Sequence, residues 1–331
     1  MMKNNPKLDE TICNFASGVF IQHLTSLQGE AAGVREAKDI EYIHRMRVAS
    51  RRLRTAMALF AGCMPPKKSS EWVRQIRQIT RSLGAARDAD VQIDWLMKYS
   101  TQHSDPKITP GIQRLILRIT QRRQRLQGQV LKSLDRLEKS GVLPDMLKQF
   151  STECDSTEVP PVYSAQLYRY ARDCIAENLK SMLSYEEIVH HPENVSELHE
   201  MRIAAKKLRY TLETFQPLYS DDIKKILGVI RSVQEHLGDI HDCDVWIVFL
   251  PEFLKEETNR MIEYLGNARM MYRYSTGIKF LEQERQSTRL KLYQNFIKDW
   301  DAWTRKGIWD QLIRLIDAPV LNMGTIYPPL M

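Results

Sequence analysis

The stretch HRMRVASRRLRTAMALF occupies residues 44–60, and a second copy, HEMRIAAKKLRYTLETF, occupies residues 199–215. Seven of the 17 positions are identical and four more are conservative. A second shared element follows each copy, SLGAARDADV at 82–91 and HLGDIHDCDV at 236–245. The offset of 155 residues is far longer than the ~20 to 50 residues of a solenoid repeat. We therefore interpret the chain as a duplication of one whole module.

Apolar residues recur at helical spacing along both modules, and strand-like alternation is rare. The pattern predicts helices near 8–28, 40–61, 69–83, 88–99 and 110–139, and again near 163–183, 196–215, 221–236, 241–256 and 258–303. Gly84 and Gly238 suit helix C-caps, and Asp88 and Asp242 suit the start of the next helix. The sequence therefore predicts an all-α fold.

The duplication predicts two antiparallel helical bundles of the four-helix type, related by a pseudo-twofold axis. The first module is expected at 1–150 and the second at 162–331. The Ser, Thr and Pro-rich stretch STECDSTEVPP at 151–161 is interpreted as the linker between them.

Composition narrows the class of protein. The chain has 331 residues, with 48 Lys and Arg against 41 Asp and Glu, and a formal net charge of +7. This excess of cations favours an anionic partner. No apolar run approaches the ~18 to 20 residues of a membrane span, so no membrane partner is expected. The five cysteines are odd in number and lack a CxxC spacing, which argues against a disulfide framework or structural zinc and favours a cytoplasmic location.

The two repeat helices carry the candidate binding residues. Each helix is split into an apolar face and an opposite basic face, and the basic faces contain almost no acidic residues. Like charges at this spacing destabilise a helix, so an external anion is expected to neutralise them. The fork of an arginine can hold phosphate oxygens bidentately. The predicted anion-binding residues are His44, Arg47, Arg51, Arg52 and Arg54 in the first copy and His199, Arg202, Lys206, Lys207 and Arg209 in the second.

Four further arginines are secondary anion-binding candidates. Arg123 and Arg285 fall on apolar helix faces at aligned positions, and each is expected either to pair with Asp88 or Asp242 or to reach an anion. Arg77 and Arg231 occupy matching positions when each is counted back from the glycine of the second element, Gly84 or Gly238. The basic stripe at 111–132 is equally compatible with a solvated surface.

The motif HxxRxxxRRLR at 44–54, its second form at 199–209, and LGxxRDxDV at 83–91 resemble the CHAD family, the conserved histidine α-helical domain. The resemblance covers nearly the whole chain. It implies two four-helix bundles whose repeated basic residues line a central channel that binds inorganic polyphosphate. It also implies a non-catalytic binding module without cofactor or metal, in the cytoplasm and in association with polyphosphate granules. The second copy departs from the first at Lys206, Lys207 and His241.

Two alternatives of other classes are considered. A metal-dependent phosphohydrolase is suggested by the paired motif histidines and by His241-Asp242, but helical metal sites usually repeat carboxylates or imidazoles at i+3 or i+4. Here Arg47 and Arg202 occupy the i+3 positions. Weak nonspecific nucleic-acid binding is expected from charge, although the basic faces lack the aromatic residues of stacking platforms. Oligomeric state and polymer length preference are not predicted.

Overall fold

The computed structural model of the protein describes residues 8–152 and 163–326, and these ranges contain no β-strand. The all-α prediction is confirmed. The first half contains α1 (Glu10–Gly29), α2 (Ala31–Glu36), α3 (Glu41–Leu59), α4 (Pro66–Gln102), α5 (Thr109–Lys139) and α6 (Val142–Ser151). The second half contains α7 (Ala165–Leu183), α8 (Val195–Phe215), α9 (Asp222–Leu265), α10 (Tyr272–Arg305) and α11 (Ile308–Ile326). Most of the predicted linker lies outside the described residues.

Local chemistry explains several helix ends. The side chain of Asp9 accepts a hydrogen bond from the Thr11 backbone N–H at 2.8 Å at the start of α1, and Ser164 caps α7 in the same way through the Leu167 N–H at 3.1 Å. These bonds satisfy donors that a helix start leaves free. Gly266 adopts a φ of +70° after α9, a conformation that glycine tolerates best. The helix predicted at 258–303 is therefore wrong, because the chain turns between α9 and α10.

Gly84 and Gly238 do not cap helices, which corrects the sequence prediction. Each lies inside a continuous helix, α4 or α9. A Cβ on Gly84 would lie 3.7 Å from Arg47 Nε, and one on Gly238 would lie 3.8 Å from Arg202 Nε. Both distances are ordinary van der Waals contacts, so a motif arginine lies against the neighbouring helix at each glycine. Neither glycine reverses the chain, so Asp88 and Asp242 are interior helix residues.

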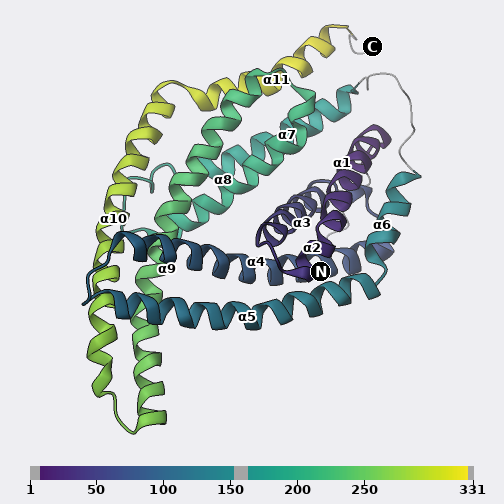
Figure 1. Ribbon diagram of the computed structural model, residues 1–331. Helices are drawn as coiled ribbons and strands as arrows, with labels where there is room; N and C mark the ends of the chain where they lie inside the picture. The colour runs from purple at the N-terminus through teal and green to yellow at the C-terminus, as the bar shows by residue number, and fades with distance from the viewer. Residues whose placement is uncertain (1–7, 153–162, 327–331) are drawn as a thin grey trace.

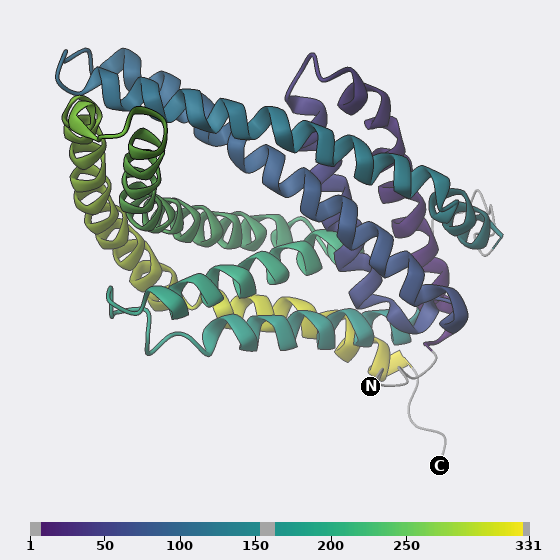
Figure 2. The ribbon, with the colours of Figure 1, turned by 90° about the horizontal axis from the view of Figure 1, so that it is seen from below.

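The long helices form an angular frame (Figures 1 and 2). Helix α4 runs beside α5, α9 runs beside α10, and the first turns of α5 and α10 meet at one corner of the molecule. A Cβ on Gly111 would lie 2.4 Å from the Tyr274 carbonyl oxygen, and one on Gly277 would lie 2.1 Å from that of Ile108. Glycine at both positions therefore permits direct backbone contact between the two halves.

A continuous apolar core joins the halves. Phe60, directly after α3, and Phe215 of α8 are fully buried, and their ring centroids are 5.7 Å apart. Phe15 of α1 stacks on Phe215 with a centroid distance of 6.0 Å. Aromatic rings bury large apolar areas and contribute strongly to the free energy of folding. The apolar faces predicted for residues 44–60 and 199–215 are thus packed against each other at one end. The pseudo-twofold relation itself stays a prediction.

The cysteine prediction needs a correction. Cys13 on α1 and Cys63, in the 3₁₀ turn after α3, form a disulfide. The two residues are 50 positions apart in sequence, and they meet because α1 and α3 pack side by side. Spacing along the chain carries no signal for such a tertiary contact. Cys174 and Cys243 remain as free thiols.

Candidate functional site

Helices α3 and α8 bring the two basic faces together where they cross. Arg47 and Arg51 of α3 and Arg202, Lys206 and Arg209 of α8 lie within electrostatic range of one another, and we call these five residues the central cation cluster. Burial, followed by repulsion from Arg47, Arg202 and Arg209, lowers the pKa of the Arg51 guanidinium. The same causes act on Lys206. The cluster therefore concentrates positive charge that the protein compensates only partly.

Arg47 and Arg202 occupy equivalent places in the two halves. Each extends across the glycine of the adjoining long helix, Gly84 or Gly238. Arg47 donates to Asp88 of α4 at 3.4 Å. The Arg202 Nε atom is buried and has no hydrogen-bond partner among the described residues. Burial lowers the pKa of Arg202, and nearby Asp242 opposes this shift. A buried donor without a partner is costly, so this N–H is a candidate donor to an anionic ligand.

Lys206 is the most perturbed cation of the cluster. Burial and then the repulsion of Arg51, Arg202 and the other arginines lower its pKa to about 7. Lys207, the next residue, is exposed and lies beside Cys174 of α7 instead. Lys207 was predicted as a binding residue, but the structure does not bring it to the central cation cluster.

One acidic residue, Glu213 of α8, partly neutralises the edge of the site. It pairs with Arg52 of α3 at 3.1 Å, Arg231 of α9 at 3.3 Å and Arg209 at 3.7 Å. Arg209 also lies over the Tyr210 ring at 4.7 Å, and Arg51 lies over the same ring from α3 at 5.5 Å. Tyr210 and Glu213 hold the arginines in place, and the sequence analysis assigned neither of them a role in the site.

Arg54 points to a neighbouring basic group on α4. Burial, then Arg77 and Arg81, lower the pKa of Arg54. Arg77, a secondary candidate, is thus placed near a predicted site residue. The sequence analysis missed Arg81, although its spacing of four residues from Arg77 places both on one helix face. These residues continue the basic surface beyond the central cation cluster.

The motif histidines have different surroundings in the two halves. His44 is half-buried and its Nδ1 has no partner among the described residues, and burial followed by the charge of Arg87 lowers its pKa. In α8, His199 Nδ1 lies 3.1 Å from His241 Nδ1. Burial and Arg202 lower the pKa of His241 to about 4. One ring must donate while the other accepts, so at least one histidine of this pair is neutral.

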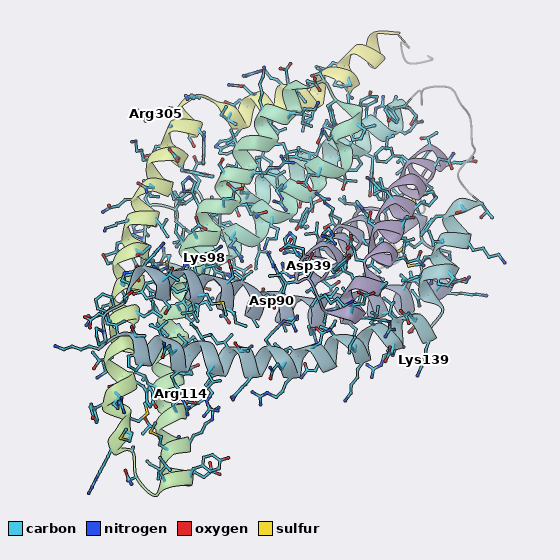
Figure 3. The ribbon with its side chains drawn as sticks, viewed as in Figure 1. Asp39, Asp90, Lys98, Arg114, Lys139 and Arg305 are labelled. Atoms are coloured by element: carbon cyan, nitrogen blue, oxygen red, sulfur yellow. A yellow bond between two sulfur atoms is a disulfide. The ribbon has the colours of Figure 1, made fainter. Side chains whose placement is uncertain are left out.

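The inward arginines of the long helices are structural. Arg123 of α5 donates to the buried Asp90 of α4 at 2.6 Å, rather than to Asp88 or Asp242 as predicted; Figure 3 labels Asp90 on α4. The equivalent contact in the second half joins Arg289 of α10 to Asp244 of α9. The predicted match of Arg123 with Arg285 is therefore wrong, because the aligned apolar residues misplaced the register by about one helical turn.

Arg285 has its own contacts. It pairs with Glu284 and lies over the Trp95 ring at 4.4 Å. Neither Arg123 nor Arg285 reaches the central cation cluster. Over the described parts of the chain, no group of three metal-ligating side chains is found, and no helix is both long and apolar enough to cross a membrane.

Comparisons with known proteins agree with the helical fold. The family profile of the CHAD domain matches residues 18–251, so the chain belongs to the CHAD family. The crystal structure of the CHAD domain from the plant Ricinus communis is similar, with a TM-score of 0.62 and 22% identity over 87% of this chain and 93% of that one. PptA from Streptomyces chartreusis has a TM-score of 0.57 and 11% identity over 90% of this chain and 100% of that one. No significant match was found among curated proteins.

Proposed function

We propose that the protein binds inorganic polyphosphate at the central cation cluster without catalysing a reaction. The observation that carries this proposal is the meeting of cations from α3 and α8, with burial and mutual repulsion lowering the pKa of Arg51, Arg202 and Lys206. A polymer with a charge on every phosphate relieves this repulsion at several residues at once and releases its counterions. Membership of the CHAD family supports the same partner.

The geometry also favours a phosphate chain over a nucleic acid. Tyr210, the aromatic residue that contacts two arginines of the cluster, is buried beneath Arg51 and Arg209 and is 7% exposed. Its ring is covered by guanidinium groups and offers no face on which a base could stack. Weak nucleic-acid binding driven by charge alone is expected to be displaced by polyphosphate at fixed salt.

Calorimetric titration with polyphosphates of graded length, beside ATP and DNA, tests the proposal. Affinity should rise with chain length and fall with salt. Lys206→Gln and Lys207→Gln form a matched pair, since the two adjacent lysines differ in whether they belong to the cluster. Lys206→Gln should weaken binding about tenfold, within the range of a lost charge-assisted contact, and Lys207→Gln should change it little. Equal losses, or equal affinity for triphosphate and long polymer, would refute the assignment.

The non-catalytic role and the location have separate tests. Phosphate release from polyphosphate should remain at background with Mg²⁺, Mn²⁺ or Zn²⁺ added, and turnover that His241→Ala abolishes would support a phosphohydrolase instead. The protein should be found in the cytoplasm with polyphosphate granules when its position is followed by fluorescence. A location that does not follow polyphosphate would contradict this part of the proposal.

A further inference from the structure

A second basic site lies in the angle between α5 and the end of α9 that projects past it (Figure 1). The groove has a volume of about 560 Å³, and it is lined by Arg118, Arg122 and Arg125 of α5 and by Phe249, Phe253 and Arg260 of α9. Small-molecule sites commonly enclose roughly 300 to 1,000 Å³. The groove shares no residue with the central cation cluster.

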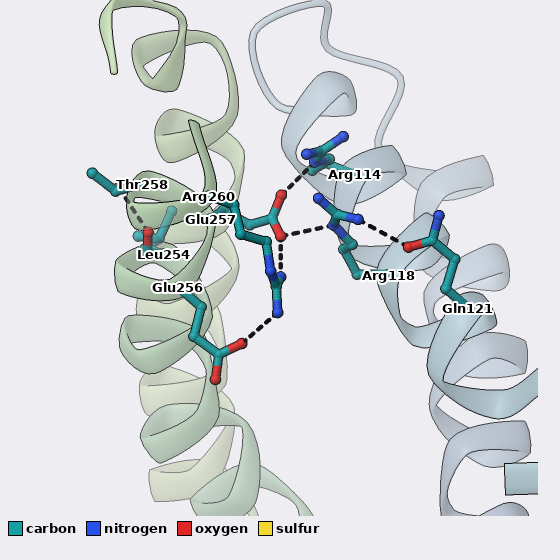
Figure 4. Close-up of polar contacts among 8 residues, drawn as sticks. All are labelled: Arg114, Arg118, Gln121, Leu254, Glu256, Glu257, Thr258 and Arg260. Atoms are coloured by element: carbon teal, nitrogen blue, oxygen red, sulfur yellow. Dashed lines mark hydrogen bonds and ion pairs between the residues drawn. The ribbon is translucent and has the colours of Figure 1, made fainter. Parts of the chain in front are cut away.

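A buried carboxylate organises one end of the groove. Glu257 is 1% exposed and accepts hydrogen bonds from Arg114 at 2.5 Å, from Arg118 at 2.7 Å and from Arg260 (Figure 4). Arg118 also donates to Gln121 at 2.9 Å. Three guanidinium groups on one carboxylate leave an excess of positive charge in a fixed arrangement. A site whose cations are held in position loses less entropy when it binds an anion.

Arg122 and Arg125 provide cations that are not engaged. Both are exposed, and within the described residues neither has an ion-pair or hydrogen-bond partner for its side chain. Arg122 follows Arg118 by four residues, and Arg125 follows Arg122 by three. All three arginines therefore project from one face of α5. Such a row suits a ligand with several negative oxygens better than a single carboxylate, because each guanidinium can hold phosphate oxygens bidentately.

The opposite wall is aromatic. Phe249 is half-buried, and its ring centroid lies 5.8 Å from that of Trp246 and 5.9 Å from that of Phe253. These neighbours fix the ring at the groove surface. Glu256, which pairs with Arg260 at 3.0 Å, adds a carboxylate acceptor at the edge. The central cation cluster has no comparable open aromatic wall, so the two sites favour different anions.

We propose that this groove binds a nucleoside diphosphate or triphosphate. The phosphates lie along Arg118, Arg122 and Arg125, the base packs on Phe249, and Glu256 accepts hydrogen bonds from ribose hydroxyls or a base amino group. The proposal is independent of polyphosphate binding, because it uses residues of α5 and α9 whereas the central cation cluster is formed by α3 and α8.

Calorimetry with ADP, pyrophosphate and adenosine tests the site. The full chain with Arg47→Glu and Arg202→Glu is the background, so that the central cation cluster does not contribute. ADP should bind about five- to 150-fold more tightly than pyrophosphate, the range expected when a base stacks on an aromatic ring, and adenosine alone should bind weakly. Phe249→Leu should remove the advantage of ADP while leaving pyrophosphate binding unchanged.

A matched pair of charge reversals locates the ligand. Arg122→Glu with Arg125→Glu should reduce ADP affinity by about two orders of magnitude, as expected for two lost charge-assisted contacts. Lys132→Glu with Arg136→Glu makes the same change in charge at exposed positions farther along α5 and should leave ADP affinity within about threefold, because those residues lie outside the groove. Equal losses in the two double variants, or ADP binding no tighter than pyrophosphate, would overturn the proposal.

Discussion

Helices α3 and α8 carry the same motif but hold their charges differently. In α3 the cluster residues are both arginines, and Arg47 has an ionic partner in Asp88. In α8 the buried Nε of Arg202 has no partner among the described residues, and Lys206 stands where the first copy has Arg51. The lysine has a pKa of about 7, whereas an arginine keeps its charge at any ordinary pH.

The two helices share the packing of the motif arginines but differ in how constant their charge is. Both helices place an arginine against a glycine of the next helix, so the packing of the motif is common to the two halves. The cluster residue whose pKa lies near neutral pH, Lys206, belongs to the second half. We infer that α3 supplies a permanent charge to the site, while the charge supplied by α8 depends on pH and on the ligand.

Among substitutions that do not reverse a charge, the largest effect is expected at Arg51. Arg51→Met removes a desolvated cation that its neighbours repel, so polyphosphate affinity should fall by about ten- to a hundredfold, the value of one charge-assisted contact. The free energy of unfolding without ligand should rise by about 1 kcal/mol, because an apolar residue replaces a poorly compensated charge.

Arg45→Met is the control for that substitution. Arg45 lies on the same helix but is exposed and pairs with Glu30 at 2.9 Å. Its loss should leave affinity nearly unchanged and stability the same or slightly lower, as is usual for an exposed pair. Denaturant unfolding and calorimetry measure both quantities, and a destabilised Arg51→Met protein would show that Arg51 is held by structural contacts rather than strained.

The next effect is the pH dependence that Lys206 produces. Its pKa is about 7 in the folded protein and 10.5 as an unperturbed group. Between these values the unfolded chain binds more protons, so ligand-free stability should increase with pH across this window. Bound polyphosphate should raise the Lys206 pKa, so binding should take up a proton near neutral pH and weaken as pH rises.

Lys206→Arg makes α8 match α3 at this position and tests the origin of the pH dependence. Calorimetry in buffers of different ionisation enthalpy should detect proton uptake by the natural protein near pH 7.5 and a clear reduction in the variant. If uptake is the same in both proteins, a group other than Lys206 is responsible and the contrast between the helices loses its basis.

The smallest effect is expected at the two glycines. A methyl group at Gly84 or Gly238 would lie at ordinary contact distance, 3.7 or 3.8 Å, from the arginine Nε. Gly84→Ala should therefore raise stability by about 0.5 to 1 kcal/mol through helix propensity, with little change in binding. Gly84→Leu should displace Arg47 and weaken binding. Thermal unfolding measures the change in stability of Gly84→Ala and Gly84→Leu, and titration measures their change in binding. A binding defect in Gly84→Ala would mean that Arg47 needs an uncovered helix surface.

The sequence predicts the helical fold well because apolar spacing is a local property. The prediction of helix ends fails at Gly84, Gly238 and Gly266. Glycine ends a helix at Gly266, but it lies inside a continuous helix at Gly84 and Gly238. Nothing in the spacing of Cys13 and Cys63 indicates their bond, because that contact depends on how α1 packs with α3. The boundary between α9 and α10 was missed because both flanks have strong helical patterns.

For the site, the repeat identifies the residues of the central cation cluster, and the structure brings five of the ten primary candidates together. Lys207 lies outside because it is one residue, about 100° of helix, away from Lys206. Arg123 was assigned the wrong partner because pairing between α4 and α5 depends on a register that sequence alone does not provide. Glu213 and Tyr210 were missed since they carry no repeated signal, and their role appears only where α3 meets α8.

The central claim is that both basic faces act on one ligand. Calorimetric titration of the natural protein, Arg47→Glu and Arg202→Glu with the same long polyphosphate tests it most directly. We predict one polymer site to which both helices contribute. Either reversal alone should lower the affinity of that site by more than about a hundredfold, beyond the loss of one charge-assisted contact, because the cations of the two helices share the ligand. Two polymer sites in the natural protein, one lost only in Arg47→Glu and the other lost only in Arg202→Glu, would contradict it.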